Sequence, residues 1–301
     1  MPRKDRSPQK ESSAQRVKLI AERAINQLAD QLESGTSEQI GLYLKAMGRF
    51  HQYSFHNLML ILSQRPDASR VAGFHTWRKL GRAVKRGEKG IAIFAPMRLR
   101  QRTARDREVD TADPEDRLIF RVVYVFDISQ TEGEPLPEPT RIKGDPAGSL
   151  DALLAGARAT GITVEKFDDL NGSDGVSMGG RILLKAGLSP AEAFAVLAHE
   201  LAHEILHKGD RENRPSKAVR ETEAEAVAFV VCKGVGLDTN TASSDYIRLY
   251  DGDSKMLIAS LDRIQKTACA ILTAIETPKK LPMPEQVATF TTKLGVATRP
   301  R

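Results

Sequence analysis

A chain of 301 residues with 41% hydrophobic and 28% charged side chains is long enough for two modest domains, each with its own core. No run approaches the ~18 consecutive apolar residues of a membrane-spanning helix, and the basic start of the chain is followed by polar residues, so we expect no secretory signal. We therefore expect a cytoplasmic protein without a membrane partner, in which Cys232 and Cys269 are reduced thiols packed in apolar helices.

The net charge of +6 is divided unevenly along the chain. Residues 1–150 carry 26 Lys and Arg against 19 Asp and Glu, a balance of +7, whereas residues 151–301 carry 19 against 20, a balance of −1. A basic half joined to a nearly neutral half indicates that the basic half binds a polyanion such as nucleic acid. A basic segment can also serve solubility alone, and charge by itself leaves both interpretations open.

The first elements are predicted to be helical. Residues 1–14 are polar and are expected to form a disordered basic tail. Apolar positions at helical spacing predict helices over residues 17–32 and 40–50. Ser54 then precedes a run rich in leucine, and it is the expected N-cap of a third, buried helix.

From residue 71 onward the pattern changes to short β-strands and turns. Residues 91–94 are apolar, and residues 118–128 form the strongest strand pattern in the chain. The charged segment 98–116 between them lacks periodicity and is predicted to be an insertion. The proline-rich stretch 134–146 indicates a linker between domains.

Residues 76–90 interleave basic side chains with glycines and one tryptophan. Cations along a backbone and aromatic rings under the bases are how proteins hold single-stranded nucleic acid. The alternative is a basic hairpin beside a core Trp77, and the chemistry favours neither. The DNA-binding interpretation predicts these contact residues: Tyr53, Trp77, Lys79, Arg82, Lys85, Arg86 and Lys89.

An H-E-x-x-H motif lies within an apolar helical run in the second half of the chain. Helical neighbours four apart share a face, so His199 and His203 can each give a ring nitrogen to one Zn²⁺. Glu200 stands beside them and is predicted to take the proton of the attacking water. Histidines that merely pack in a core helix are the alternative, but two buried imidazoles and a carboxylate are costly to leave unpaired.

A third metal ligand is expected from the helix that follows. Glu221 and Glu225 are four apart and share a face, while Glu223 points away from both. One of the pair is predicted to bind the metal, and the other to hydrogen-bond a ligand histidine. His207 is a rival third ligand, and a solvated acidic helix start is the alternative for the glutamates.

The motif H-E-L-A-H followed by E-T-E-A-E-A resembles the glutamate zincins. The resemblance implies Glu221 as the third ligand and Glu225 as the residue that orients a ligand histidine. It also implies that the strand over residues 180–185 forms the upper rim of a cleft and pairs with an extended peptide, where the alternative is an ordinary edge strand. Tyr246 or Tyr250 is a candidate for stabilising the oxyanion, unless both simply pack.

A second resemblance is carried by Y-S-F-H-N, then F-H-T-W-R-K-L-G-R-A-V-K-R-G-E-K-G-I, then V-F-D-I-S-Q-T-E-G. In this order they resemble the N-terminal domain of ArdC-type antirestriction proteins, over about residues 15–135. The resemblance implies a single-stranded-DNA-binding domain ahead of a zincin-like metallopeptidase domain. It also implies protection of incoming plasmid or phage DNA from host restriction.

The sequence therefore predicts an α+β fold of two domains and one Zn²⁺ per chain. The expected partners are single-stranded DNA and a protein or peptide substrate. Two other functions remain open: a non-enzymatic protein that coats single-stranded DNA and has a structural zinc, and a regulatory zinc protease that cleaves a repressor. The predicted boundaries are a tail over 1–14, a DNA-binding domain over 15–135, a linker over 136–148, a metallopeptidase domain over 149–278 and a second tail over 279–301.

Overall fold

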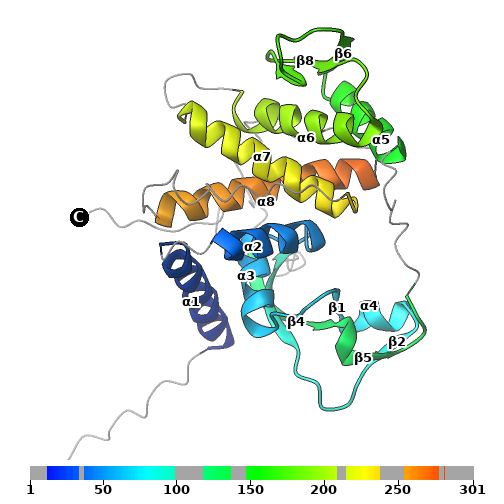
Figure 1. Ribbon diagram of the computed structural model, residues 1–301. Coiled ribbons are helices and arrows are strands. Elements are labelled where there is room, and N and C mark those ends of the chain that lie inside the picture. Colours follow the sequence, from blue (N-terminus) through cyan, green and yellow to red (C-terminus); the bar gives the residue numbers. More distant parts are fainter. Residues whose placement is uncertain are drawn as a thin grey trace, which may run out of the picture. The chain divides into compact units, whose positions relative to one another are not determined.

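The computed structural model (Figure 1) describes these residues: 12–33, 37–98, 118–136, 147–208, 215–237, 254–277 and 281. The chain divides into two compact units. The first unit consists of residues 1–26 and 59–136, and the second of residues 27–58 and 137–301. The division falls inside helix α1 (Ser13–Glu33) and inside helix α3 (Phe55–Gln64). The predicted domain boundaries stay a prediction.

The predicted N-terminal helices are present. Helix α2 (Ser37–Arg49) follows α1, and α3 begins directly after Ser54, whose hydroxyl accepts a hydrogen bond from the Asn57 N–H at 3.3 Å as the expected cap. One detail of the prediction is wrong. Helix α1 begins at Ser13, so the last residues of the predicted disordered tail are helical, and a cap explains this: the Ser12 hydroxyl accepts from the Gln15 N–H at 3.2 Å.

The first unit is built on a three-stranded antiparallel sheet. Strand β4 (Leu118–Asp127) lies at its centre, between β1 (Val71–Gly73) and β3 (Ile91–Arg98). A separate ladder joins β2 (Arg82–Val84) to β5 (Thr131–Gly133). The strands predicted over residues 91–94 and 118–128 are thus confirmed. The predicted insertion lies almost wholly outside the described residues.

A buried carboxylate connects the two sheets of the first unit. Asp127 ends β4 and caps the short 3-10 helix η1 (Ile128–Gln130). Its Oδ2 accepts hydrogen bonds from the N–H groups of Ser69 at 2.7 Å and Arg70 at 3.0 Å. Its Oδ1 accepts from the N–H and hydroxyl of Ser129 at 3.0 and 2.7 Å. Burial alone would raise the pKa of Asp127, but these donors outweigh it and lower the pKa.

The only tryptophan of the chain belongs to the core of the first unit. It lies on the short helix α4 (Phe74–Lys79), and Trp77 is only 2% exposed. Its indole N–H donates to the Phe126 carbonyl at 2.9 Å. A ring held in this way cannot stack under a nucleic acid base. The prediction that Trp77 contacts DNA is therefore wrong, and the alternative of a core tryptophan holds.

The second unit is a stack of helices that carries one small sheet. Helix α6 (Pro190–Leu206) packs against α7 (Lys217–Gly234), and α7 against α8 (Ser254–Glu276) and α2 (Figure 1). Helix α5 (Ala147–Ala159) contacts α6 and α8. Gly48 lets α2 approach α7 closely, because an added Cβ would lie 2.9 Å from the Val230 carbonyl oxygen. In the described part of the chain, no helix is both long and apolar enough to cross a membrane.

The sheet of the second unit places one strand beside α6. Strand β8 (Arg181–Lys185) is central, with β6 (Thr163–Phe167) parallel on one side and β7 (Gly175–Ser177) antiparallel on the other. The strand predicted over residues 180–185 is therefore present, but its predicted role is wrong. Both of its edges are occupied by neighbouring strands, so it cannot pair with a peptide. The strand at the edge that contacts α6 is β7.

Candidate metal centre

The helix that carries the motif begins at a strong start signal. The Ser189 hydroxyl accepts a hydrogen bond from the Glu192 N–H, and the Glu192 carboxylate accepts from the Ser189 N–H at 2.8 Å. Pro190 occupies the first turn, where its missing N–H costs nothing. One face of the helix is then fully buried through Phe194 and Leu197. The cap and the buried face together determine which way the motif residues point.

Three donor atoms from two helices meet at one point. The Nε2 atoms of His199 and His203 lie 3.1 Å apart. The Oε2 atom of Glu221, on α7, lies 3.5 Å from the first of them and 3.3 Å from the second. Bonds of 2.0–2.1 Å around a tetrahedral ion place neighbouring ligand atoms roughly 3.3 Å apart. The three side chains can therefore hold one divalent cation without rearrangement.

The charge state of the two imidazoles suits this role. Burial lowers the pKa of His199, and the Glu221 carboxylate only partly opposes it. Burial also lowers the pKa of His203, and the neighbouring His199 adds to the effect. A histidine must be neutral to give its nitrogen lone pair to a metal. Both pKa shifts favour the neutral form of the rings even without an ion.

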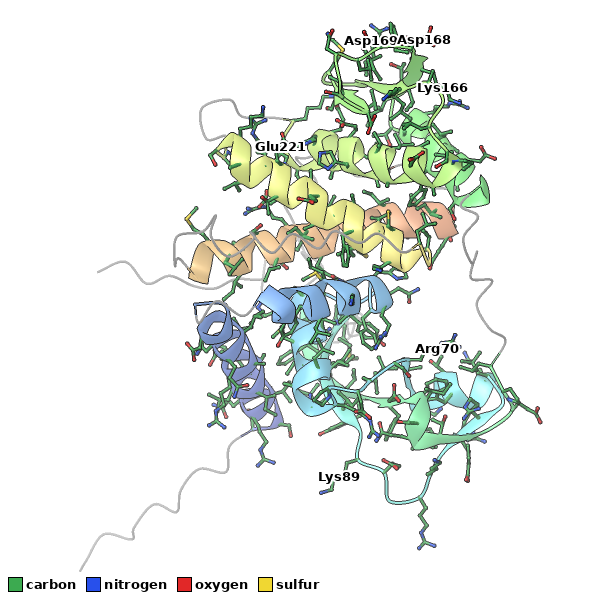
Figure 2. All side chains as sticks on the ribbon, in the orientation of Figure 1. Arg70, Lys89, Lys166, Asp168, Asp169 and Glu221 are labelled. Atoms are coloured by element: carbon green, nitrogen blue, oxygen red, sulfur yellow. The ribbon has the colours of Figure 1, made fainter. Side chains whose placement is uncertain are left out.

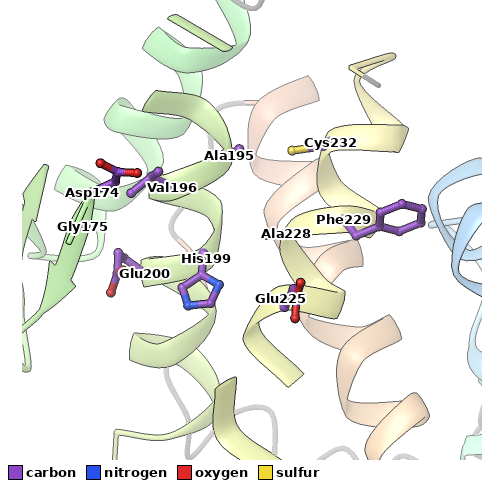
Figure 3. A pocket seen from close by; sticks show the side chains of 10 residues that line it. All are labelled: Asp174, Gly175, Ala195, Val196, His199, Glu200, Glu225, Ala228, Phe229 and Cys232. Atoms are coloured by element: carbon purple, nitrogen blue, oxygen red, sulfur yellow. The ribbon is translucent and has the colours of Figure 1, made fainter. Parts of the chain in front are cut away.

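Glu200 faces away from α7 toward β7, as Figure 3 shows. Its side chain is buried, and burial first, then the charge of Glu221, raises its pKa to about 7. A hydrogen bond with the Ser177 backbone lowers the pKa of Glu200, and the charge of Glu204 raises it. Strand β7 approaches this closely only because residue 175 is glycine: a Cβ there would lie 3.0 Å from Glu200 Oε1.

Glu204 is a site residue that the sequence reasoning did not predict. It is 1% exposed, and its Oε1 accepts from the Ser177 hydroxyl at 2.6 Å and the Gly179 N–H at 2.8 Å. Its Oε2 accepts from the Gly180 N–H at 2.8 Å and pairs with Lys208 at 3.3 Å. The turn between β7 and β8 is thus tied to α6. The available signal was a second acidic residue one helical turn after Glu200.

Two cavities meet at the histidine and glutamate of the motif. The smaller, about 330 Å³, is lined mainly by apolar side chains of α6 and α7 (Figure 3). The larger, about 770 Å³, runs along β7 and the adjoining ends of α6 and α7. His199 and Glu200 line both. The apolar lining of the smaller cavity consists of Ala195, Val196, Ala228, Phe229 and Cys232.

His207, the rival third ligand, is directed elsewhere. Its Nε2 lies 3.7 Å from Oε2 of Glu223, and burial lowers its pKa to about 3. Glu223 is itself fully buried and accepts hydrogen bonds from Ser260, at 2.6 Å, and from Arg263. These contacts join α7 to α8. The structure therefore brings Glu221, and not His207, to the two imidazoles.

The remaining predicted residues of this site have different outcomes. Glu225 lines the smaller cavity together with His199 and lies across from it in Figure 3. Its role in orienting a ligand histidine stays a prediction. Tyr246 and Tyr250 lie outside the described residues.

The predicted DNA contacts are not all available in the first unit. The guanidinium of Arg82 donates to Thr131 Oγ1 at 2.8 Å and to the carbonyls of Thr131, Gly133 and Glu134 at 3.1, 3.2 and 2.5 Å. These bonds use the guanidinium to join β2 to β5, and the binding of DNA by Arg82 stays a prediction.

Four other predicted contacts differ in exposure. Lys79, Arg86 and Lys89 are exposed. Lys85 is also exposed, although its Nζ donates to the Ser129 carbonyl at 3.0 Å. Their binding of DNA stays a prediction.

Tyr53 does not belong to the same unit as the other predicted contacts. It is half-buried against Phe50, with ring centroids 6.3 Å apart, and burial raises its pKa. Its carbonyl accepts a hydrogen bond from the Gln265 side chain of α8 at 3.1 Å. Both partners belong to the second unit, so Tyr53 supports the packing of that unit.

Fold and site together define a class of protein. It is a two-domain α+β protein whose second unit carries an H-E-x-x-H helix and, as the third metal donor, a glutamate. Residues 18–126 match the family model for the N-terminal domain of the anti-restriction factor ArdC. Residues 157–232 match the model of the IrrE N-terminal-like domain, a peptidase family, and this range includes all four motif and donor residues. The predicted resemblance to ArdC-type antirestriction proteins is confirmed by these two matches in this order.

The individual proteins similar to this chain have low sequence identity to it. An uncharacterized protein of Bacillus anthracis is 26% identical, over 76% of this chain and 46% of its own length. The chain thus spans about half the length of that curated relative. Two crystal structures of the antirestriction ArdC protein from the R388 plasmid are also similar. The metal-free form has 20% identity and a TM-score of 0.44, over 79% of this chain and 86% of that one. The Mn(II)-bound form has 19% identity and a TM-score of 0.46, over 84% of this chain and 98% of that one.

Proposed function

We propose that the chain is an antirestriction-like protein that binds single-stranded DNA and carries a zinc-dependent peptidase site, and that it protects incoming mobile-element DNA in the cytoplasm. One observation carries the enzymatic part: donor atoms of His199, His203 and Glu221 lie within 4.8 Å of one another beside the buried Glu200. Two neutral imidazoles and one carboxylate form the ligand set of many zinc hydrolases.

The proposed reaction is hydrolysis of a peptide bond. When bound, a divalent ion acts as a Lewis acid that polarises a carbonyl and acidifies water. Glu200 takes the proton from the attacking water and passes it to the leaving amine, and a pKa near 7 suits both transfers. The edge strand β7 lines the larger cavity, which supports an extended peptide as the substrate.

Metal analysis tests the site directly. We expect about one zinc ion per chain in purified protein, since the three donors form one site. Glu200→Gln should retain the ion and lose peptide hydrolysis, whereas His203→Ala should lose both. Elemental analysis and cleavage of a fluorogenic peptide library are the measurements. Protein that takes up neither zinc nor manganese would refute the metal site.

In-cell protection of transferred DNA separates the enzymatic function from the alternatives. We expect Glu200→Gln to reduce protection. If it leaves protection unchanged while Lys85→Glu with Arg86→Glu abolishes it, the chain acts by coating DNA and the peptidase role is wrong. A regulatory protease would instead retain cleavage of its target, and lose no protection, in the Lys85 and Arg86 variant.

A further inference from the structure

Strands β3 and β4 expose aromatic rings on one face of their ladder. Alternation places Phe120 and Tyr124 on the same face of β4, and the register adds Phe94, which lies opposite Val122 on β3. Tyr124 is 55% exposed and Phe120 42%, while Phe94 is half-buried. The three rings, called the aromatic face below, alternate between two strands along one surface.

The opposite face of the same ladder packs in the core. Ile91, Ile93 and Val125 are buried there. The aromatic face is therefore turned outward by the period-2 alternation of the strands. Exposed apolar side chains that are grouped on one surface indicate a binding site, whereas single exposed ones are common on any protein.

A basic loop ends against the aromatic face. Residue 90 is glycine, and a Cβ added there would lie 2.8 Å from the Tyr124 Cβ, so the chain passes directly beside that ring. Lys89 comes immediately before it and projects from the loop in Figure 2. Arg86 is exposed in the same loop. The positive charge of the loop thus lies at one end of the row of rings.

The loop is held by the buried Gln130. The Gln130 side-chain amide donates to the Lys89 carbonyl at 2.9 Å and to Oε2 of Glu88 at 2.8 Å. The second contact engages the acidic side chain of the loop, which is exposed. Arg86 and Lys89 are also exposed in this hydrogen-bonded loop, which suits an anionic chain lying across the neighbouring rings.

We propose that the aromatic face and the loop over residues 85–89 form the surface that binds single-stranded nucleic acid. Bases stack on Tyr124, Phe94 and Phe120, and phosphates lie beside Arg86 and Lys89. Strands rise about 3.4 Å per residue, so the two rings of β4 are roughly 14 Å apart. Stacking on rings does not depend on base identity, so binding has little sequence preference. The inference rests on the proposed function, and it assigns DNA contact to rings other than Trp77.

Ring removal tests the surface. Binding of a fluorescently labelled oligo(dT) is measured by anisotropy for Tyr124→Ala, Phe120→Ala and both together. Each single change should weaken binding about 5- to 150-fold, the range for loss of one base–aromatic stack. Tyr124→Phe keeps the ring and should bind like the wild type. Phe167→Ala, which removes a ring that is 41% exposed in the second unit, is the matched control and should have no effect.

Salt dependence separates the rings from the cations. Arg86→Ala with Lys89→Ala should reduce the slope of log affinity against log salt by about 1.4, because each phosphate contact on a single strand contributes ~0.7. Tyr124→Ala should leave the slope unchanged. Circular dichroism and thermal melting test whether each variant is folded. We expect that they are, because the substituted side chains are exposed.

The outcomes distinguish the two proposals. If the wild type does not bind oligo(dT), the DNA-binding part of the proposed function is wrong. If the wild type binds and the folded double variant Phe120→Ala, Tyr124→Ala binds equally well, only the surface is wrong. Equal competition by a duplex of the same sequence would also overturn it, since paired bases cannot reach the rings.

Discussion

Two carboxylates one helical turn apart have opposite properties in this site. Burial raises the pKa of both Glu200 and Glu204. For Glu200, the nearby negative charges add to burial, and its pKa reaches about 7. For Glu204, hydrogen bonds from Ser177, Gly180, Lys208 and Gly179 outweigh burial, and the pKa is lowered. The first residue can therefore exchange a proton near neutral pH, and the second stays charged and anchors the strand turn.

Glu204→Ala should destabilise the protein by several kcal/mol. It removes the acceptor of three hydrogen bonds, and each buried donor left without a partner costs about 1–3 kcal/mol. Glu165→Ala is the matched control, because its pair with Arg181 is exposed to solvent and such pairs contribute little to stability. Urea denaturation measures both. Similar small losses in the two variants would show that Glu204 does not hold the turn.

Asp127 should make stability fall in acid. Its pKa is lower in the folded protein than in the unfolded chain, so its contribution is present above the unfolded value of about 3.9 and is lost as the pH falls through the folded value. Asp127→Asn should be less stable at neutral pH and should lack this acid-dependent loss. Denaturation curves of both proteins at a series of pH values test this. Parallel pH dependence in the two would contradict it.

At the scale of elements, close approach between backbones brings the site together. Gly175 lets β7 lie against α6, since a Cβ there would meet Val196 Cγ1 at 2.5 Å. The Ser177 backbone then reaches Glu200, and its hydroxyl reaches Glu204. A strand of three residues is thus held by contacts with a helix as well as by its single neighbouring strand. The position of Glu200 depends on this packing.

Gly175→Ala should reduce peptide hydrolysis about tenfold or more, because a shift of about 1 Å in a reacting group can cost ~100-fold. Zinc content should not change, since the three donors lie on α6 and α7. Gly148→Ala is the control: nothing lies within 4 Å of its added Cβ, so activity should be unchanged. Hydrolysis rates and metal content are measured together. Full activity of the Gly175 variant would contradict the packing argument.

At the scale of the whole molecule, the two units are expected to respond differently to metal. All three donors belong to the second unit, and none to the first. An ion that binds only the folded state stabilises it by about 2.7 kcal/mol when its concentration is 100 times Kd. Metal binding should therefore stabilise the second unit alone.

Removal of metal by a chelator should lower the melting temperature of the second unit and leave that of the first unchanged. Differential scanning calorimetry with and without chelator is the measurement. His203→Ala, which lacks a donor, should melt at the same temperature under both conditions. A chelator effect that persists in this variant would locate the ion elsewhere.

Sequence reasoning was sufficient where the information is local. The spacing of His199 and His203 places both rings on one helix face, whatever surrounds the helix, and the strand over residues 118–128 is recognisable from its own composition. The exposed rings of Phe120 and Tyr124 were not recognised, because alternation gives two faces without telling which is buried. Glu204 was missed because its three donors come from a turn some 25 residues earlier in the chain.

By itself, the sequence determined the N-terminal helices, the strands over residues 91–94 and 118–128, the α+β class and the common direction of the motif side chains. Only the tertiary structure decided that Glu221, and not His207, joins the two imidazoles, and that Trp77 is buried while Tyr124 is exposed. The physical reason is that a side chain's partners lie on other elements. The packing of α7 on α6, and of β4 between its neighbours, determines which atoms meet. The periodicity of a single element does not predict that packing.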